Sequence, residues 1–513
     1  MARKNEAGNR RVFCAEPAAT SAENALARRA FLKTAAMGAG AIGLAPEWIP
    51  GAKAADAGKH ETAGGQTVTL ANYAAALRYE DLPASVVRRT RDCITDTVAA
   101  ILYGEKLPWS RIIIAHAQRT GPGGKSQILG AGSAPVQAPL AALAHGAMAH
   151  AFELDNLTDP DSGSHPGATM FSSALAVAQE HGGSGRDLIT AMAAGGEVMI
   201  RIGSAGKDTI EPHGFHAPGA TGPFGAAIAS GKIRKFDAGK IRNAMGIAGS
   251  LGGGLMEFAH APEGAMVKKL HLGRAAESGV LAASLADGGF TGPSTVVEGQ
   301  EGWLHGFSND WDTDILTRGL GQDFLMLHIM LKRFACHITA HRPVEAMLDL
   351  RRDNRFPPED VQSIVIVGNR RLATTNNIPV PADALLAQYS IPFCVALSLY
   401  RNPVDPDSFD DRVHRDARIL AMAAKVKMEI VDGQPNDDLT SVVSVVLKDG
   451  RKLTRRATEF SGTPANPLDE AGLREKFMLL AKRYPAPAMT RLFDRLQVIE
   501  AEPDLDWLTV PAA

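Results

Sequence analysis

Residues 145–169 read HGAMAHAFELDNLTDPDSGSHPGAT, and this stretch determines how we interpret the rest of the chain. An Ala-rich apolar segment with two histidines is followed at once by the acids Glu153 and Asp155. A polar loop then ends at His165, before a second Ala-rich segment begins. Loops between rigid elements commonly hold binding and catalytic groups. The pattern predicts a site at the ends of two helices or, with about equal weight, solvated loop acids beside a His-Pro turn.

The composition limits the class of protein. The 513 residues are enough for two sizeable domains, and the net charge of −2 argues against a nucleic-acid-binding protein, which needs a basic face. Aromatic residues make up only 6%, a balance that favours closely packed helices. The four cysteines form no C-x-x-C pair, so neither a disulfide framework nor an iron–sulfur cluster is indicated. The sequence contains no run of about 18 apolar residues, so no ordinary membrane span is predicted.

The first 55 residues have the pattern of an export signal. Arg28-Arg-Ala-Phe-Leu-Lys33 is similar to a twin-arginine motif, the weakly apolar run 35–44 follows it, and Ala52-Lys-Ala54 is a small-residue cleavage site. We therefore predict a twin-arginine signal peptide and linker over 1–55 and a periplasmic protein that has no membrane contact after cleavage. The alternative is a disordered tail with a chance pair of arginines.

The remaining chain predicts a mainly α fold in two parts. Residues 66–331 together with 466–510 are expected to form a large helical domain, and 332–465 are expected to form a smaller α+β lid domain. Helical spacing of apolar residues predicts helices over 83–103, 107–118, 135–152, 170–181, 184–203, 219–232, 237–250, 273–287, 467–484 and 487–500. Period-two alternation predicts strands over 361–367 and 425–431 and a hairpin over 441–456.

Two further polar clusters lie just before predicted helices. In 213–222, glycines and a proline place His216 before a helix expected to start near residue 220, and the N–H groups of that helix suit a carboxylate. A histidine packed in a turn is the slightly favoured alternative. In 266–274, cations stand near a helix start, where the helix dipole disfavours them unless an anion is present.

A fourth cluster, KRFACHITAHR over 332–342, raises the question of a metal. His337 and His341 are four residues apart, but Ile338 stands where a zinc protease helix needs Glu, and the cysteines do not complete a zinc set. A metal-dependent hydrolase therefore remains only a rival hypothesis. The chain also lacks a G-x-G-x-x-G loop after a strand, a Walker loop and a G-x-S-x-G elbow. Histidines, lysines and acids on loops are typical of acid–base chemistry on a small polycarboxylate without a cofactor.

These clusters, taken in order, resemble the motifs of the MmgE/PrpD family, which includes 2-methylcitrate dehydratase, cis-aconitate decarboxylase and iminodisuccinate epimerase. The family blocks H-A-L-D-F-D-D-T…H-P, G-F/W-H-P-T-G-T, K-x-L-H-x-G-x-A-A, G-F-T-G-P and K-x-F-x-x-H correspond to segments beginning at His150, Gly214, Lys268, Gly289 and Lys332. The resemblance covers residue 68 to the C-terminus and keeps chain order. It implies a helical domain with a smaller α+β lid, a homodimer, and a site between the two parts.

Several residues fall on the family's active-site positions or beside them. The resemblance implies catalytic roles for His165, His216, Lys268, Lys332 and His337. Substrate contacts are expected from Glu153, Asp155, His271, Arg274, Tyr389 and Phe393. Three positions depart from the family pattern: Glu153 replaces a common Asp, Leu157 replaces a common Thr, and Phe393 stands where a Tyr is often found.

The sequence therefore predicts a cofactor-independent lyase of the dehydratase type that abstracts a proton α to a carboxylate of a di- or tricarboxylate. An epimerase or isomerase of the same family and a non-catalytic periplasmic carboxylate-binding protein are the alternatives. No metal ligands, cofactor or nucleic-acid partner are predicted.

Overall fold

Two Ala- and Gly-rich helices come into close backbone contact at the centre of the helical part. These are α5 (Ala138–Ala149) and α10 (Val267–Asp287). A Cβ atom on Gly146 would lie 2.8 Å from Gly273 Cα, and one on Gly273 would lie 2.3 Å from the Leu143 carbonyl oxygen. Only glycine permits such an approach. Because Lys268 and His271 lie on α10, this contact also fixes the distance between these two residues and α5.

Replacing Gly273 with alanine is expected to destabilise the protein. The new methyl group would overlap the α5 backbone, and overpacking of this kind costs on the order of 1–3 kcal/mol. Urea unfolding of Gly273→Ala measures the loss. Gly306→Ala is the matched control, since a Cβ there meets no atom within 4 Å and alanine favours a helix. Equal stability of the two variants would contradict the close contact.

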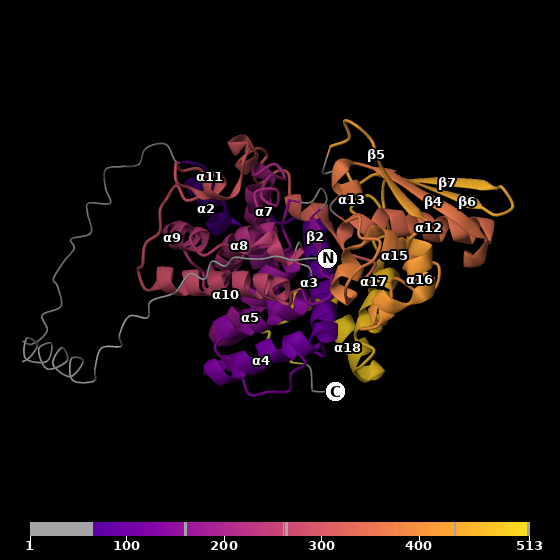
Figure 1. Cartoon of the computed structure of the whole chain (residues 1–513). Coiled ribbons are helices and arrows are strands. Elements are labelled where there is room, and N and C mark those ends of the chain that lie inside the picture. The colour runs from indigo at the N-terminus through magenta and orange to yellow at the C-terminus, as the bar shows by residue number, and fades with distance from the viewer. Residues whose placement is uncertain are drawn as a thin grey trace, which may run out of the picture. The chain divides into compact units, whose positions relative to one another are not determined.

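The computed structural model describes residues 65–158, 162–259, 261, 265–374, 376–435 and 438–509, all within one compact unit. It confirms a mainly α protein (Figure 1). The other helices are α2 (Gln66–Ala76), α3 (Ala84–Gly104), α4 (Pro108–Thr120), α6 (Ser172–His181), α7 (Gly185–Ala205), α8 (Ala217–Ile233), α9 (Ala238–Gly249), α11 (Trp303–Phe307), α12 (His341–Asn354), α13 (Arg370–Thr374), α14 (Ala384–Tyr389), α15 (Ile391–Ser398), α16 (Ala417–Ala423), α17 (Glu470–Leu480) and α18 (Ala486–Leu496).

The predicted helices are confirmed, with shifts at their ends. Ser184 caps α7 as expected: its hydroxyl accepts from the Asp187 N–H at 3.2 Å, and the Asp187 carboxylate accepts from the Ser184 N–H at 3.0 Å. The predicted start of α10 at residue 273 is wrong, because the helix begins at Val267. Its N-cap residue, Met266, makes no side-chain cap, so the local sequence carries no start signal there.

A four-stranded sheet forms in the later part of the chain, with the order β5-β4-β6-β7. Its strands are β4 (Val361–Gly368), β5 (Val426–Ile430), β6 (Ser441–Leu447) and β7 (Lys452–Ala457). The predicted strands and hairpin are confirmed. The central pair β4 and β6 is antiparallel, whereas β4 and β5 are parallel. The helix α12 packs on β6 and β7, and α15 contacts β5 (Figure 1).

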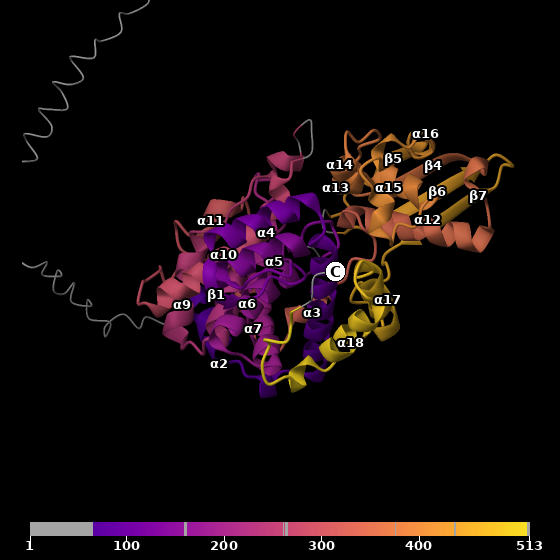
Figure 2. The same ribbon diagram turned by 90° about the horizontal axis from the view of Figure 1, so that it is seen from below.

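The C-terminal helices return to the start of the chain. α17 and α18 both pack against α3, as Figure 2 shows. The ammonium group of Lys476 on α17 contacts Asp96 Oδ1 at 2.5 Å and the Leu154 carbonyl oxygen at 3.0 Å, and all three residues are buried. This contact ties the last helices to the segment that follows α5. The boundaries of the two predicted domains and the predicted homodimer remain predictions.

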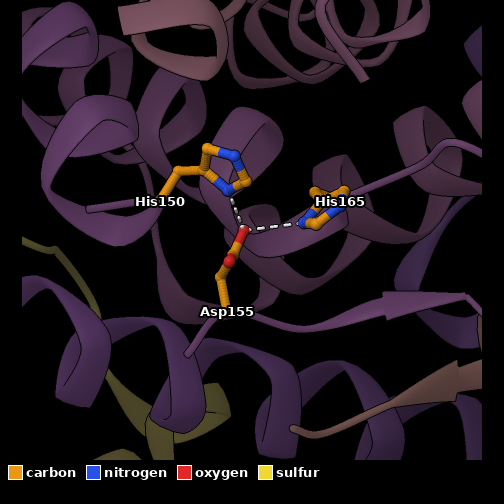
Figure 3. Close-up of side chains that lie close together, drawn as sticks. All are labelled: His150, Asp155 and His165. Atoms are coloured by element: carbon orange, nitrogen blue, oxygen red, sulfur yellow. Dashed lines mark hydrogen bonds and ion pairs between the residues drawn. The ribbon is translucent and has the colours of Figure 1, made fainter. Parts of the chain in front are cut away.

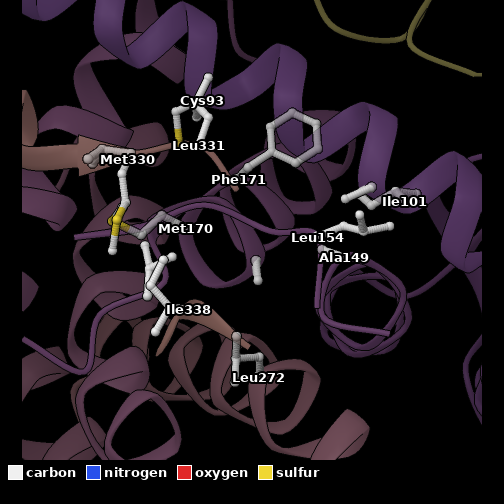
Figure 4. Close-up of a cluster of buried hydrophobic side chains, with 14 of the residues drawn as sticks. Cys93, Ile101, Ala149, Leu154, Met170, Phe171, Leu272, Met330, Leu331 and Ile338 are labelled. Atoms are coloured by element: carbon white, nitrogen blue, oxygen red, sulfur yellow. The ribbon is translucent and has the colours of Figure 1, made fainter. Parts of the chain in front are cut away.

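A continuous apolar core underlies these contacts. Figure 4 shows part of it, where Phe171 and Ile101 pack near Leu154, and where Met330 and Ile338 approach from the later part of the chain. The helix α7 is apolar and long enough to cross a membrane, but 94% of its most apolar window is buried inside the protein, as expected of a core helix. The predicted export signal and its cleavage site lie outside the described residues.

Candidate active site

One cavity collects most of the residues singled out in the sequence. All five predicted catalytic residues line it, together with Glu153 and Tyr389. These residues come from the loop after α5, the start of α8, the start of α10, the segment after β3 and the end of α14. The lining residues are Glu153, Leu157, Gly163, His165, Glu211, His216, Pro218, Met256, Phe258, Ala259, Lys268, Lys332, His337, Ile338, Arg371, Asn376, Ile378 and Tyr389.

Glu153 forms the ionic centre of this cavity. It is fully buried and not a solvated loop acid: its carboxylate pairs with the ammonium group of Lys268 and, at 2.8 Å, with that of Lys332. Burial opposes the ionisation of Glu153, but the two lysines outweigh burial and hold its pKa well below the ordinary value. The sequence indicated an anion beside the cations at the start of α10, and the carboxylate of Glu153 is that anion.

The backbone of Glu153 is unusual as well. Its φ of 57° lies in the left-handed region, which residues other than glycine seldom adopt. Such conformations cost on the order of 1–3 kcal/mol and persist only where surrounding contacts hold them. The two lysine contacts and the Tyr389 hydroxyl, 3.4 Å from Glu153 Oε1, provide that hold.

A short antiparallel pairing brings Lys332 to Glu153. β2 (Leu157–Thr158) pairs with β3 (Ile329–Met330), with Leu157 opposite Met330. Lys332 follows β3 by two residues, so the pairing places it beside the loop that carries Glu153. Leu157, where the family often has Thr, is 2% exposed and lines the cavity with an apolar side chain.

Asp155 joins two histidines through a single oxygen atom. Its Oδ2 lies 2.7 Å from His165 Nδ1 and 2.9 Å from His150 Nδ1, as Figure 3 shows. Burial opposes ionisation of Asp155, but the two histidines hold its pKa well below the ordinary value, so it is a carboxylate that only accepts hydrogens. Both histidines must then carry hydrogen on Nδ1. In the neutral form of His165, Nε2 is therefore the nitrogen that carries the lone pair.

The loop around this group is fixed to α3. Asn156 accepts from the Gly167 N–H at 2.9 Å and donates to Asp96 and Thr97 at 3.0 Å each. The segment Gly167–Phe171, directly after His165-Pro166, is a π-helix that leads into α6. Single π-helical turns of this kind often occur at functional sites.

The group His150, Asp155 and His165 also matches a donor set for a metal ion. Its three ligand atoms lie within 4.8 Å of one another, and two histidines with one carboxylate suit several transition metals. A metal ion bound through Nδ1 of either ring would have to replace a hydrogen bond to Asp155 Oδ2. The short distances to one shared oxygen fit hydrogen bonding better than coordination.

His216 is paired with a third histidine. It is the N-cap residue of α8, and its Nδ1 lies 3.0 Å from His271 Nδ1. Burial, reinforced by the charge of Lys268, lowers the pKa of His216 well below the ordinary value and that of His271 to about 4. Both rings are therefore neutral near pH 7. The ring of Phe258 packs edge-on against both.

His337 and Tyr389 line another part of the cavity. Their rings stack with centroids 4.7 Å apart, and His337 Nδ1 contacts the Thr339 hydroxyl at 2.9 Å. Burial lowers the pKa of His337 and, together with Glu153, raises that of Tyr389. Tyr389 thus provides the aromatic hydroxyl of this cavity.

The structure does not bring every predicted residue into the cavity. Phe393 is fully buried within α15, four residues beyond Tyr389, and lies in the apolar core. Arg274 is six residues beyond Lys268 on α10, about one and two thirds turns, so it faces another direction. Its side chain is 53% exposed and pairs with Glu277. His271 does not line the cavity but contacts it through His216.

The proposed metal pair is also separated. His337 lines the cavity, whereas His341 is fully buried, where its Nε2 accepts from the Phe334 N–H at 3.2 Å and its ring packs on Phe460. These are the contacts of a core histidine. Within the described ranges, the two do not belong to a group of three or more possible ligands.

Sequence reasoning missed several lining residues. Glu211, Phe258, Arg371 and Asn376 stand in segments without a recognisable motif. Asn376 is 1% exposed, and its Oδ1 has no hydrogen-bond partner among the residues that the structure describes. Only the proximity of Glu211 to the His213–His216 cluster could have indicated any of them.

His145, the first histidine of the opening stretch, lies outside the cavity and predicts a pH effect on stability. It is fully buried, accepts from the Leu129 N–H at 3.0 Å, and burial lowers its pKa to about 4. The unfolded chain, with a pKa near 6.5, binds the proton first, so stability falls as the pH falls from about 6.5 towards 4. We expect wild type to lose about 1.6 kcal/mol more than His145→Gln between pH 6.5 and 5. Urea unfolding at both pH values tests this.

The control for that experiment is His116→Gln, since His116 is exposed on α4. Its pH dependence should match wild type. Equal pH dependence of His145→Gln and wild type would contradict the prediction.

Comparison with known proteins gives two consecutive family matches. The MmgE/PrpD N-terminal domain matches residues 68–316, and the MmgE/PrpD C-terminal domain matches 334–496. A cis-aconitate decarboxylase of Aspergillus terreus is 27% identical over 451 residues, which cover 81% of this chain and 89% of that protein. The human cis-aconitate decarboxylase is 26% identical over 434 residues, covering 81% and 88%. A cis-aconitate decarboxylase-like protein of Aspergillus oryzae is 28% identical over 335 residues, covering 62% and 67%.

Proposed function

Because this chain belongs to the MmgE/PrpD family, we propose that it is a lyase that acts on a small di- or tricarboxylate, without a cofactor, by removing a proton α to a carboxylate. The similarity to cis-aconitate decarboxylases supports a lyase. The reaction follows from the side chains that line the cavity.

The observation that carries the proposal is the pairing of His165 with Asp155. The carboxylate holds the ring in the tautomer with a lone pair on Nε2, and it stabilises the imidazolium that forms when Nε2 takes a proton. His165 is therefore the base in this proposal. A histidine without such a partner would lack both advantages.

The cations supply the second requirement. Proton removal α to a carboxylate leaves negative charge on the carboxylate oxygens, and fixed cations in a closed site stabilise that charge. Lys268 and Lys332 lie in the same cavity as His165. Two ammonium groups face the single carboxylate of Glu153, and this excess of cations supports an anionic substrate, although burial lowers the pKa of Lys268.

The direction of the electrons then follows. The pair from the broken C–H bond forms the new C=C bond, and the leaving hydroxyl departs as water after receiving a proton. His216, on the other histidine pair of the cavity, is the donor in this proposal. In a decarboxylation, CO₂ leaves in place of water, and the proton from His216 is transferred to carbon and not to a leaving hydroxyl.

Deuterium exchange tests the proposal. Protein is incubated in D₂O with citrate-, malate- and aspartate-like acids, and masses are measured. Deuterium uptake with loss of water or CO₂ is expected, and His165→Gln should lower the rate by on the order of 10²–10⁴. His213→Gln, at an exposed histidine of the neighbouring cluster, should behave as wild type.

The other results are equally informative. Uptake without a change of composition would indicate an epimerase. Tight binding of an acid without exchange would indicate a binding protein, and wild-type turnover in His165→Gln would remove His165 as the base.

A further inference from the structure

The contact between His216 and His271 has a chemical requirement that their separate positions do not reveal. Two ring nitrogens lie 3.0 Å apart, and both are Nδ1. Two lone pairs would repel at that distance, and two N–H groups would collide. One ring must therefore donate and the other accept, so the pair shares a single hydrogen between its Nδ1 atoms.

This shared hydrogen decides what His216 presents to the substrate. A neutral imidazole carries one hydrogen on its two nitrogens, so the partner of one nitrogen determines the state of the other. If His216 donates to His271, its Nε2 is a lone pair and can act only as a base. If His271 donates, Nε2 of His216 carries hydrogen and can act as an acid. His216 is 5% exposed and lines the cavity, so this difference reaches the substrate.

The surroundings of the two histidine pairs favour the second arrangement. His165 is held by a carboxylate, which requires N–H at Nδ1 and makes Nε2 a base. His216 faces a neutral imidazole, and Lys268 further disfavours a positive charge on it. Groups whose environments differ in this way commonly divide into base and acid. A cavity with His165 as base is complete when His216 holds the proton to be delivered.

We propose that His271 is a positioning residue: it donates from Nδ1 to His216 Nδ1 and thereby fixes His216 in the tautomer with hydrogen on Nε2. The choice of His271 as the donor rests on the proposed function, because it follows from His165 acting as the base, whereas the single hydrogen shared between the two Nδ1 atoms follows from their distance alone. His271 does not line the cavity and contacts no substrate in this account. This positioning role replaces the substrate contact that the sequence predicted for His271.

The local fold supports a role that depends on ring orientation. Gly254, with a φ of 115°, passes so close to the His271 ring that a Cβ atom there would lie 3.0 Å from Nδ1. The carbonyl oxygen of Gly254 accepts from the backbone N–H of His216 at 2.9 Å. The same glycine therefore contacts the ring of His271 and the backbone of His216. His271 is only partly buried, so solvent reaches part of this residue.

The proton balance of one turnover is also satisfied. His216 Nε2–H gives its hydrogen to the leaving group, and the electron pair of that N–H bond stays on the ring. His271 passes its Nδ1 hydrogen to His216 Nδ1, while His271 Nε2 takes one hydrogen from water at the surface. Meanwhile His165 holds the proton that it removed from the substrate. After the product has left, water takes that proton from His165 and gives one to His216 Nε2. His216 Nδ1 then returns its hydrogen to His271 Nδ1, and His271 Nε2 releases one to water, so both rings regain their first tautomers.

Two isosteric replacements separate this role from a structural one. His271→Asn keeps an amide N–H that can take the place of Nδ1 as a donor, so His216 should remain protonated on Nε2. His271→Asp has nearly the same shape but only accepts, so it forces hydrogen onto His216 Nδ1 and leaves a lone pair on Nε2. A structural role would treat the two alike.

The readout is ¹⁵N NMR of substrate-free protein labelled at histidine. Loss of one pair of signals in His216→Gln identifies His216. We expect Nε2–H in wild type and in His271→Asn, and Nδ1–H in His271→Asp. Deuterium exchange should be within about tenfold of wild type in the Asn variant and lower by on the order of 10²–10⁴ in the Asp variant.

The outcomes distinguish this inference from the proposed function. Nδ1–H on His216 in the wild type overturns the inference, even if the protein turns over an acid. If the wild type exchanges hydrogen with an acid, equal exchange rates in the Asn and Asp variants also overturn it. The expected tautomers without exchange on any acid would support the inference and overturn the proposed lyase.

Discussion

Asp155→Asn is expected to lower kcat by on the order of 10²–10⁴ while KM changes little. The carboxylate oxygen that accepts from both His150 and His165 becomes part of a neutral amide. With its carbonyl oxygen in that position, the amide keeps the contacts but no longer stabilises the imidazolium of His165. With its nitrogen there, it donates to Nδ1 and forces hydrogen onto Nε2, so the base is lost. Both arrangements slow proton removal.

Steady-state kinetics and deuterium exchange measure this effect, and a buried acid outside the cavity provides the control. Asp96 is unsuitable because it holds Asn156 in the loop of the site. Glu105 is buried, accepts from the Tyr484 hydroxyl at 3.1 Å and does not line the cavity, so Glu105→Gln should reduce the free energy of unfolding and leave kcat of the folded protein close to wild type. Equal losses of kcat in both variants would show that Asp155 acts on the fold and not on His165.

Glu153→Gln is expected to destabilise the protein by about 3–5 kcal/mol, because it leaves the ammonium groups of Lys268 and Lys332 buried without an anion. The replacement has the same shape, so packing is kept and only the charge is removed. The loss of stability should be smaller when an anion binds in the cavity beside the two lysines. We therefore expect citrate to raise the melting temperature of Glu153→Gln by more than it raises that of wild type.

Glu197→Gln is the matched control for the charge effect. Glu197 is fully buried, accepts from Arg201 Nε at 2.9 Å, and lies outside the cavity. It too should lose stability, but citrate should not restore it. A Glu153→Gln protein as stable as wild type, or one indifferent to citrate, would show that the two lysines do not depend on Glu153.

The helices were predictable because their signals are local. Apolar spacing identified α3 and α7, and the pair Ser184 and Asp187 marked the start of α7. The start of α10 was not predictable in this way, because its first turn has no capping side chain and begins with buried lysines. Burial of Lys268 reflects a tertiary contact with Glu153, which overrides the local preference.

The site was predictable in its membership and less so in its geometry. Family motifs indicated His165, His216, Lys268, Lys332 and His337, and the structure brings them to one cavity. The sequence alone left the burial of the acids open, since a loop acid with a distant partner looks like a solvated one. The choice between the two aromatic residues required the structure, because Tyr389 ends α14 whereas Phe393 lies inside α15.

The partners of Glu153 also define when the site can form during folding. Lys268, Lys332 and Tyr389 lie 115, 179 and 236 residues further along the chain. Contacts between such distant residues form late, because loop closure must precede them. A growing chain that has not reached residue 332 can pair Glu153 with only one lysine. Glu153 therefore has both lysine partners only after the later segments of the chain have folded. In a chain that stops before residue 332, Glu153 lacks one of the two ammonium groups that pair with it.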